Sequence, residues 1–379
     1  MACKMEREYK ICNRCIMDTS DHDIQFDEKG LCNHCKKYEE RVEKELYYKH
    51  KDGEQKLNQL VNQIKEKGKN KEYDCIIGVS GGVDSTFVAY IVKKLGLRPL
   101  AVHLNNGWNS EISERNIENT CKALDIDLYT SVPDWEEFKD LQLSFLKSSV
   151  SNSEIPTDHA IIAFLFQVAS ERGIPYIIRG HNIVTEAILP SSWGYDSGDL
   201  KFINGIHNKF GKVKLKTFPH YNLIDMFNYI FIKKIKFIPI LNYIKYDKKE
   251  AMRIIEKELG WRYYGGKHYE SIYTRFFQGY ILPKKFGIDK RRAHLSTLIC
   301  SGQMTRDEAL EEMKKDPYPT EEMMNDDKEY VIKKLGLTEK EFEKIMSLPI
   351  KTFTDYPNNY FLISKRWLIV RLAKKLRWA

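Results

Sequence analysis

The hexapeptide at residues 80–85, with sequence SGGVDS, constrains the fold of this chain more than any other feature. A short apolar run, 73–79, comes before it, and a run typical of a helix, 86–94, follows it. A strand, a glycine-rich turn and a helix in this order direct backbone N–H groups and a helix N-terminus at a bound anion. The sequence therefore predicts a phosphate-binding loop in an α/β fold, and a plain capped turn is the alternative.

The residue types of this loop suit a nucleotide phosphate with a metal ion. Two glycines let the backbone approach a phosphate where a Cβ would clash, and the two serines add hydroxyl donors. The charge of Asp84 would repel phosphate, so we expect a magnesium ion between them and give Asp84 a catalytic, metal-binding role. The nucleotide contacts predicted in the loop are Ser80, Gly81, Gly82, Val83, Asp84 and Ser85.

Four cysteines near the N-terminus form two C-x2-C pairs with sixteen residues between them: Cys12, Cys15, Cys32 and Cys35. This spacing is typical of a structural zinc site, and a segment this short cannot build a core of its own. We predict a zinc-ribbon module over 1–45 that fills all four positions of the metal. An iron–sulfur cluster and free thiols are the alternatives. His34, inside the second pair, is expected at the surface.

The rest of the chain divides into three parts by pattern. Residues 46–72 are rich in Lys and Glu with spaced apolar positions, which predicts a helical linker. Residues 73–264 alternate apolar runs with helix-like stretches, which predicts a doubly wound parallel sheet whose ligands bind beyond the carboxyl ends of its strands. Residues 265–379 are mainly helical and are expected to bind substrate or a partner.

The C-terminal part opens with a block that combines aromatic residues, glycines, Lys, His and Arg, which is typical of a polar binding surface. Lys267 and His268 are candidate catalytic groups there, with His268 as the candidate general base. Arginines suit carboxylates and phosphates. We therefore expect Arg275, Lys290 and Arg291 to contact substrate. A basic helical face packed on an aromatic core is the alternative.

Composition limits the choice of location and partner. No apolar leader follows the first residues and no apolar run reaches the ~18 residues of a membrane span. We therefore expect a cytoplasmic protein with no membrane partner. The net charge of +8 is modest, and it suits a nucleotide, a nucleic acid or solubility alone.

The loop 80–85 resembles the SGGxDS signature of the PP-loop ATP pyrophosphatases, which split ATP between its α and β phosphates. The cysteine pairs and four further motifs look together like the N-acetyl sugar amidotransferases, which act in bacterial surface-polysaccharide or flagellin-glycan synthesis. The likeness is strongest to the amidotransferase of pseudaminic acid biosynthesis. The motifs are HLNNGWNSE (103–111), RGHNIVTEAILPSSW (179–193), YGGKHYES (264–271) and DKRRAHLSTLICSGQMTRDEAL (289–310).

The resemblance implies an adenine nucleotide alpha hydrolase-like fold that uses ATP, Mg²⁺ and a structural Zn²⁺. PP-loop enzymes often have a Gly-His motif followed by acidic residues at the end of the fourth strand. This implies that Gly180, His181 and Asn182 approach the nucleotide, that His181 has a catalytic role, and that Glu186 helps to hold magnesium. A bracing role for His181 is the alternative. From the second strand, the residues expected at the adenine are His103 and Asn105, with Trp108 at the substrate.

The resemblance also implies a reaction. The oxygen of an N-acetyl group on a sugar is adenylated by ATP, and ammonia then displaces AMP to leave an acetamidino group. The chain has no Cys–His arrangement of a glutaminase, so the resemblance implies separate glutaminase and ammonia-channel partners like the two halves of imidazole glycerol phosphate synthase. There are two alternative functions: a tRNA-thiolating PP-loop enzyme and a non-catalytic zinc scaffold. We do not expect a nucleic-acid partner for this chain.

Overall fold

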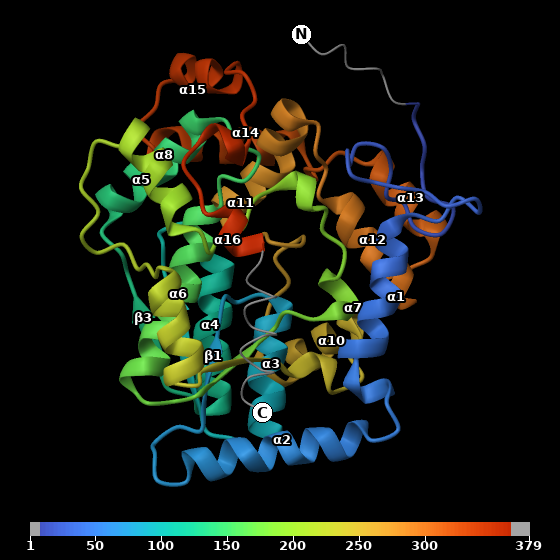
Figure 1. Ribbon diagram of the computed structural model, residues 1–379, viewed down its shortest axis with the longest axis vertical. Coiled ribbons are helices and arrows are strands. Elements are labelled where there is room, and N and C mark those ends of the chain that lie inside the picture. Colours follow the sequence, from blue (N-terminus) through green and yellow to red (C-terminus); the bar gives the residue numbers. More distant parts are fainter. Residues whose placement is uncertain (1–7, 365–379) are drawn as a thin grey trace.

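The computed structural model describes residues 8–364 and is organised around a five-stranded parallel sheet (Figure 1). The strand order is β3-β2-β1-β4-β5, so the winding reverses between β1 and β4 and leaves a crevice at their carboxyl ends. This confirms the predicted doubly wound sheet. The strands are β1 (Cys75–Gly78), β2 (Pro99–Leu104), β3 (Leu128–Ser131), β4 (Tyr176–Arg179) and β5 (Lys236–Pro239).

The two central strands are apolar along their length because helices cover both faces of the sheet. Ile76 and Ile177 point into one core, while Ile77 and Ile178 point into the other, and all four are fully buried. The first core lies beneath α6 (Ile155–Glu171). The second lies beneath α3 (Val83–Lys94), α4 (Glu111–Leu124) and α10 (Lys248–Leu259).

The N-terminal part is helical after its cysteines. Helix α1 (Asn33–Glu45) leads through a short 3-10 turn, η1 (Tyr47–Lys49), into α2 (Gly53–Gly68). Helix α2 lies within the predicted linker and is amphipathic, with Val61 and Ile64 buried against the core under α3. No helix among residues 8–364 has the length and hydrophobicity that crossing a bilayer requires.

From residue 265 to 364 the regular elements are all helices, which confirms the predicted mainly helical C-terminal region. Residues 1–7 and 365–379, the outer ends of the first and last predicted regions, lie outside the described residues. The remaining helices are α5 (Trp135–Ser148), α7 (Ile183–Glu186), η2 (Ser191–Trp193), α8 (Leu200–Phe210), α9 (Leu223–Phe227), η3 (Asn228–Ile232), η4 (Ile240–Asn242), α11 (Ile272–Phe276), η5 (Phe277–Phe286), α12 (Arg291–Ser301), α13 (Arg306–Lys314), α14 (Glu321–Lys334), α15 (Glu339–Met346), η6 (Phe353–Asp355) and α16 (Tyr360–Ser364).

The cysteine-bearing module packs against α12 and α13, which Figure 1 shows beside it. The backbone N–H of Ile16 donates to the hydroxyl of Ser296 at 3.2 Å. The guanidinium of Arg306 donates to the carbonyl oxygens of Cys12 and Cys15, each at 3.2 Å. The module is therefore attached to helices near the other end of the chain.

Gly81 is the residue of the loop after β1 that most depends on being glycine. Its φ is +75°, and a Cβ placed there would overlap the carbonyl oxygen of Ser113 in α4. Gly302 has a similar φ of +78° but has no neighbour within 4 Å of that position. Left-handed backbone alone costs an L-residue about 1–2 kcal/mol.

We therefore predict that Gly81→Ala lowers the midpoint of urea unfolding more than Gly302→Ala does. Gly302→Ala measures the cost of left-handed backbone, and Gly81→Ala adds the overlap with Ser113. Equal losses in the two variants would show that α4 yields to the new methyl group.

Candidate active site

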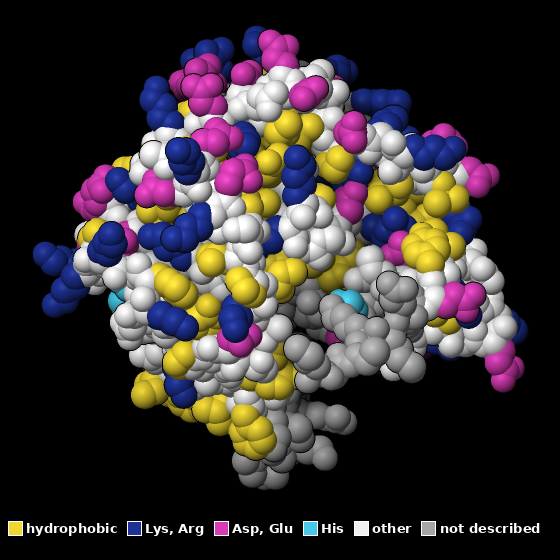
Figure 2. Space-filling model, turned by 90° about the horizontal axis from the view of Figure 1, so that it is seen from above, with side chains coloured by type: hydrophobic (Ala, Val, Ile, Leu, Met, Phe, Trp, Pro, Cys, Tyr) yellow, Lys and Arg dark blue, Asp and Glu magenta, His cyan; other side chains and the backbone are white. Residues whose placement is uncertain are grey.

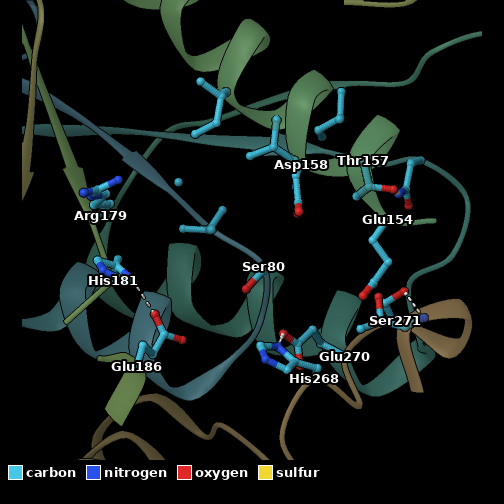
Figure 3. A pocket seen from close by; sticks show the side chains of 18 of the residues that line it. Ser80, Glu154, Thr157, Asp158, Arg179, His181, Glu186, His268, Glu270 and Ser271 are labelled. Atoms are coloured by element: carbon cyan, nitrogen blue, oxygen red, sulfur yellow. Dashed lines mark hydrogen bonds and ion pairs between the residues drawn. The ribbon is translucent and has the colours of Figure 1, made fainter. Parts of the chain in front are cut away.

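A cavity of about 610 Å³ lies at the carboxyl ends of β1, β2 and β4 (Figure 3). The loops after these strands form one side, the N-terminal turn of α6 forms a second, and the segment 267–294 forms a third. Its size is within the usual range for a ligand site. The predicted site residues that line it are Ser80, His103, Gly180, His181, Glu186, Lys267, His268 and Lys290.

Hydrogen bonds of its own serine hydroxyl groups fix the loop after β1. The two hydroxyl oxygens of Ser80 and Ser85 are 3.1 Å apart, and the backbone N–H of Gly82 donates to the Ser80 hydroxyl at 3.3 Å. Gly82 is the N-cap of α3 and offers no capping side chain, so this helix N-terminus, where a bound anion is favoured, carries no side-chain cap of its own. Gly180 fits closely here, since a Cβ would lie 3.1 Å from the backbone of Asp84 and Ser85.

Two carboxylates meet beside this loop. Asp84 accepts a hydrogen bond from the hydroxyl of Tyr246, and its pKa is raised by burial and then by the charge of Glu186. Glu186 accepts from His181 at 2.9 Å and lies 3.5 Å from the ammonium of Lys267. Burial alone would raise the pKa of Glu186, but Lys267 and His181 outweigh it and lower that pKa.

Such a pair of half-buried carboxylates suits a hard cation with oxygen ligands, so Asp84 and Glu186 are the residues that would hold Mg²⁺. A cation held there would relieve their mutual repulsion. Tyr246 is a member of this group that the sequence analysis missed. Its partner Asp84 lies 162 positions away, so nothing in the local sequence marks it.

Cations and a neutral histidine form the third side of the cavity. Burial, together with the charges of Lys267, His268, Lys290 and Lys248, keeps the pKa of His294 well below its usual range. His294 is therefore neutral, and its neighbours form a positive region that suits an anionic ligand. Lys248 and His294 were not predicted. Lys248 begins α10 and has the sequence context of a surface lysine, although it is half-buried and desolvation lowers its pKa.

Three predicted substrate residues do not reach the cavity. Both guanidinium contacts of Arg275 go to Asp327 at 2.6 Å, and Arg291 pairs with Asp289 at 2.7 Å. Trp108 is only 1% exposed, in the core beneath α6. The two arginines form ion pairs within the protein and the tryptophan packs in the core, so nothing in the geometry supports the predicted substrate contacts.

Two residues that were predicted to contact the nucleotide instead make hydrogen bonds to nearby backbone groups. Asn182 is fully buried and its side-chain oxygen caps α7 by accepting from the backbone of Thr185 at 2.9 Å. Asn105 accepts from the backbone of Gly107 at 2.9 Å and stabilises the turn after β2. Neither lines the cavity. His103 does, but its Nδ1 donates to a backbone carbonyl, and burial lowers its pKa.

The four predicted metal-binding cysteines come together. The Sγ atoms of Cys12 and Cys35 are 3.8 Å apart, and those of Cys15 and Cys32 are 3.7 Å apart. All four are buried, and they are the group among residues 8–364 whose ligand atoms can meet on one ion. A tetrahedral zinc site with Zn–S bonds of about 2.3 Å has sulfur separations of about 3.8 Å. The tetrad is therefore compatible with zinc.

His34 differs from the sequence prediction. It is buried rather than at the surface, and its Nε2 lies 2.6 Å from a carboxylate oxygen of Asp21. Asp21 also accepts from the hydroxyl of Ser192 at 2.6 Å, in the segment after α7. His34 thus helps to attach the module to the loop beyond β4.

Two known families match separate parts of this chain. A family described as NAD synthase matches residues 54–139, which include the SGGVDS loop on its strand and helix. This part of the chain is similar to the PP-loop ATP pyrophosphatases. A second family, described as LPS biosynthesis protein WbpG-like, C-terminal domain, matches residues 270–373. The two matches together support a PP-loop protein of the amidotransferase type.

Individual relatives are distant. GMP synthase of Thermus thermophilus is 25% identical over 192 residues, which are 49% of this chain and 34% of that protein. The tRNA-specific 2-thiouridylase MnmA 2 of Fusobacterium nucleatum is 27% identical over 115 residues, 28% of this chain and 33% of that protein. The chain thus spans about one third of the length of these curated relatives. The solved NH3-dependent NAD synthetase of Campylobacter jejuni has 19% identity and a TM-score of 0.28, covering 54% of this chain and 83% of that one.

We predict that the purified protein contains one zinc ion per chain and that Cys15→Ser removes it and lowers the midpoint of thermal unfolding, because metal binding contributes to folding. Elemental analysis and a thermal scan measure the two effects. Cys300→Ser is the matched control, since Cys300 lies 3.8 Å from Cys35 but outside the tetrad. Iron with labile sulfide in place of zinc would contradict the prediction.

Proposed function

We propose that this PP-loop enzyme is an ATP-dependent amidotransferase that converts the N-acetyl group of a bacterial surface-glycan sugar into an acetamidino group. The observation that carries the proposal is a shared cavity. The PP-loop forms one part of its wall, and the segment that matches the WbpG-like family contributes another part, including Glu270, Lys290 and His294. A nucleotide at the loop and a second substrate at that segment would meet in one space. An N-acetyl sugar of the pseudaminic acid type, free or nucleotide-linked, is the substrate we propose.

The described residues divide the work of this reaction among them. The N–H groups at the start of α3 and the hydroxyl of Ser80 bind the leaving pyrophosphate, and Asp84 and Glu186 would hold the Mg²⁺ that supplies compensating positive charge. Lys267 and Lys290 balance the remaining negative charge. No covalent nucleophile is needed, because the amide oxygen itself attacks the α-phosphorus. The main tasks of the protein are to position the reactants and to exclude water from the activated amide.

Ammonia comes from a partner in this proposal. None of the residues that line the cavity, among those the structure describes, is a cysteine. Described cysteines outside the tetrad are buried at Cys75 and Cys121, or lie beside the tetrad at Cys300. We therefore propose a separate glutaminase with an ammonia channel, resembling the subunits of imidazole glycerol phosphate synthase.

A tRNA-modifying activity is the second candidate, because tRNA-specific 2-thiouridylases are among the proteins to which part of this chain is similar. Sulfur transfer generally uses a cysteine near the adenylated base, and the lining of this cavity contributes none. On the face that Figure 2 shows, Lys and Arg side chains are interspersed with Asp and Glu rather than gathered into a basic stripe. Both observations favour the sugar substrate.

We predict that the enzyme with ATP, Mg²⁺, ammonium chloride and the correct N-acetyl sugar releases AMP and pyrophosphate and yields a product in which an oxygen is replaced by NH. Mass spectrometry detects this exchange. Glutamine in place of ammonium should give no amidine with the purified chain alone. Amidine formation from glutamine at full rate would contradict the need for a partner. Adenylation or thiolation of tRNA, with no reaction on any sugar, would support the second candidate.

Asp84→Asn should slow AMP release by about 10²-fold or more, because it removes a proposed ligand of the metal that neutralises the leaving pyrophosphate. The variant should fold normally, since the amide has the same shape and carries no buried charge. Glu256→Gln, an exposed change on α10, is the control. Full activity of Asp84→Asn would contradict the magnesium assignment.

A further inference from the structure

The proposed reaction contains a proton transfer that needs an acceptor in the cavity. When ammonia adds to the activated carbon, the new nitrogen carries a positive charge, and one of its protons must leave before an amidine can form. The acceptor must face the cavity, must be free of other partners and must be able to hold a proton near neutral pH.

Two acidic residues of α6 meet the first requirement. Glu154 and Asp158 lie one helical turn apart at the N-terminal end of this helix, and both line the cavity. Figure 3 shows them extending from the helix toward the cavity, with Ser80 and His268 on the other side of the space. They therefore lie across the cavity from the PP-loop, where the second substrate would enter.

The two carboxylates differ in how they are held. Glu154 is 8% exposed, accepts a hydrogen bond from Gln278 at 3.1 Å and lies 3.7 Å from the ammonium of Lys290. Asp158 has no hydrogen bond to its carboxylate from any residue among 8–364. One carboxylate is thus fixed by the protein, and the other is available to a ligand.

The surroundings of Asp158 suit a group that gains and loses a proton. The Asp158 side chain is exposed to the cavity, and desolvation by the cavity walls, followed by the charge of Glu154 at the N-cap of α6, raises its pKa to about 7. Lys290, just before α12, and His268, just before α11, oppose this rise and limit it. An acceptor whose pKa is near the working pH is the most effective one for proton transfer.

The two histidines of the cavity are poorer acceptors. His294 is surrounded by cations, which disfavour its protonation. His268, the general base that the sequence suggested, lies 3.6 Å from the carboxylate of Glu270 and faces His294 with ring centroids 5.4 Å apart. It is placed to stabilise Glu270 and the anionic ligands rather than to take a proton from a cationic nitrogen.

We propose that Asp158 is the group that accepts the proton from the attacking ammonia, with Glu154 beside it stabilising the positive charge; this rests on the amidotransferase function proposed above. The lone pair of ammonia forms a bond to the activated carbon. One proton passes from that nitrogen to the Asp158 carboxylate. The bond between the carbon and the AMP oxygen then breaks, its electron pair leaves with AMP, and Asp158 releases its proton to solvent.

The same pair of carboxylates suits the product. An amidinium is a planar cation whose N–H groups point in two parallel directions, as in a guanidinium, and such a fork matches a carboxylate in a bidentate arrangement. The starting N-acetyl group is neutral and makes no such pair. The carboxylates of α6 therefore interact more strongly with the charged species formed after ammonia attacks than with the substrate.

The test compares full-length wild-type enzyme with Asp158→Asn and with Glu171→Gln, an exposed acid-to-amide change at the other end of α6. Exchange of pyrophosphate into ATP, with sugar and without ammonium, reports adenylation. Amidine formation with ammonium chloride reports the ammonia step. We expect Asp158→Asn to slow amidine formation by about 10²-fold or more while slowing exchange far less, and Glu171→Gln to change neither.

The pH dependence gives a second readout. With rates expressed per free ammonia, amidine formation by the wild type should rise with pH as the Asp158 carboxyl ionises near pH 7, because only the carboxylate accepts a proton. Asp158→Asn should lose this rise, and Asp158→Glu, which keeps the acid, should recover it. The recovery also distinguishes a chemical role from misfolding of the asparagine variant.

Three results would overturn the proposal. They are an unchanged amidine rate in Asp158→Asn, an equal fall in exchange and amidine formation, and a pH profile that the substitution leaves in place. If the proposed amidotransferase function is itself wrong, the wild-type enzyme makes no amidine from any N-acetyl sugar, and this result is distinct from the three above.

Discussion

The repulsion between two half-buried carboxylates, Asp84 and Glu186, is the interaction on which the arrangement of this site depends. Removing like charges from water and placing them together is costly unless opposite charges or a metal compensate. Here Lys267 comes from the C-terminal segment, His181 from the loop after β4 and Tyr246 from the segment before α10. Segments far apart in the sequence therefore converge on the reversal point of the sheet. This convergence brings the region that matches the WbpG-like family onto the nucleotide loop.

The cysteine module stabilises that convergence from outside. Arg292 of α12 lies 3.1 Å from the carboxylate of Asp18 and donates to the carbonyl of Ile16 at 2.7 Å, so the start of α12 is fixed to the module. Lys290 and His294, which line the cavity, lie on either side of this contact. A metal held by the cysteine tetrad would thus help to set the position of groups in the cavity, because the start of α12 contacts both the module and the cavity.

Features defined by short-range pattern could be predicted from the sequence, and features defined by distant partners could not. The SGGVDS loop, the alternating strands and helices and the cysteine pairs each lie within a few tens of residues, and the structure has the predicted sheet and the gathered tetrad. Arg275 has the residue type of an anion contact, but its partner Asp327 is 52 positions away and invisible to local pattern. Asp158 was missed for the opposite reason, since an acid in the first turn of a helix usually only stabilises the helix dipole. Its neighbours at 268 and 290 become apparent only after folding.

The contact between the module and α12–α13 also bears on how the chain is made. Ile16 is fully buried with Leu295 and Ala309, and its bond to Ser296 spans 280 positions. Domains fold largely in order as they leave the ribosome, so the module can be complete long before the helices that cover it exist. During that interval its apolar docking side, including Ile16, is exposed to solvent and to other nascent chains. A shortened chain that ends before α12 would keep this side uncovered permanently, which makes premature termination a source of aggregation as well as of lost activity.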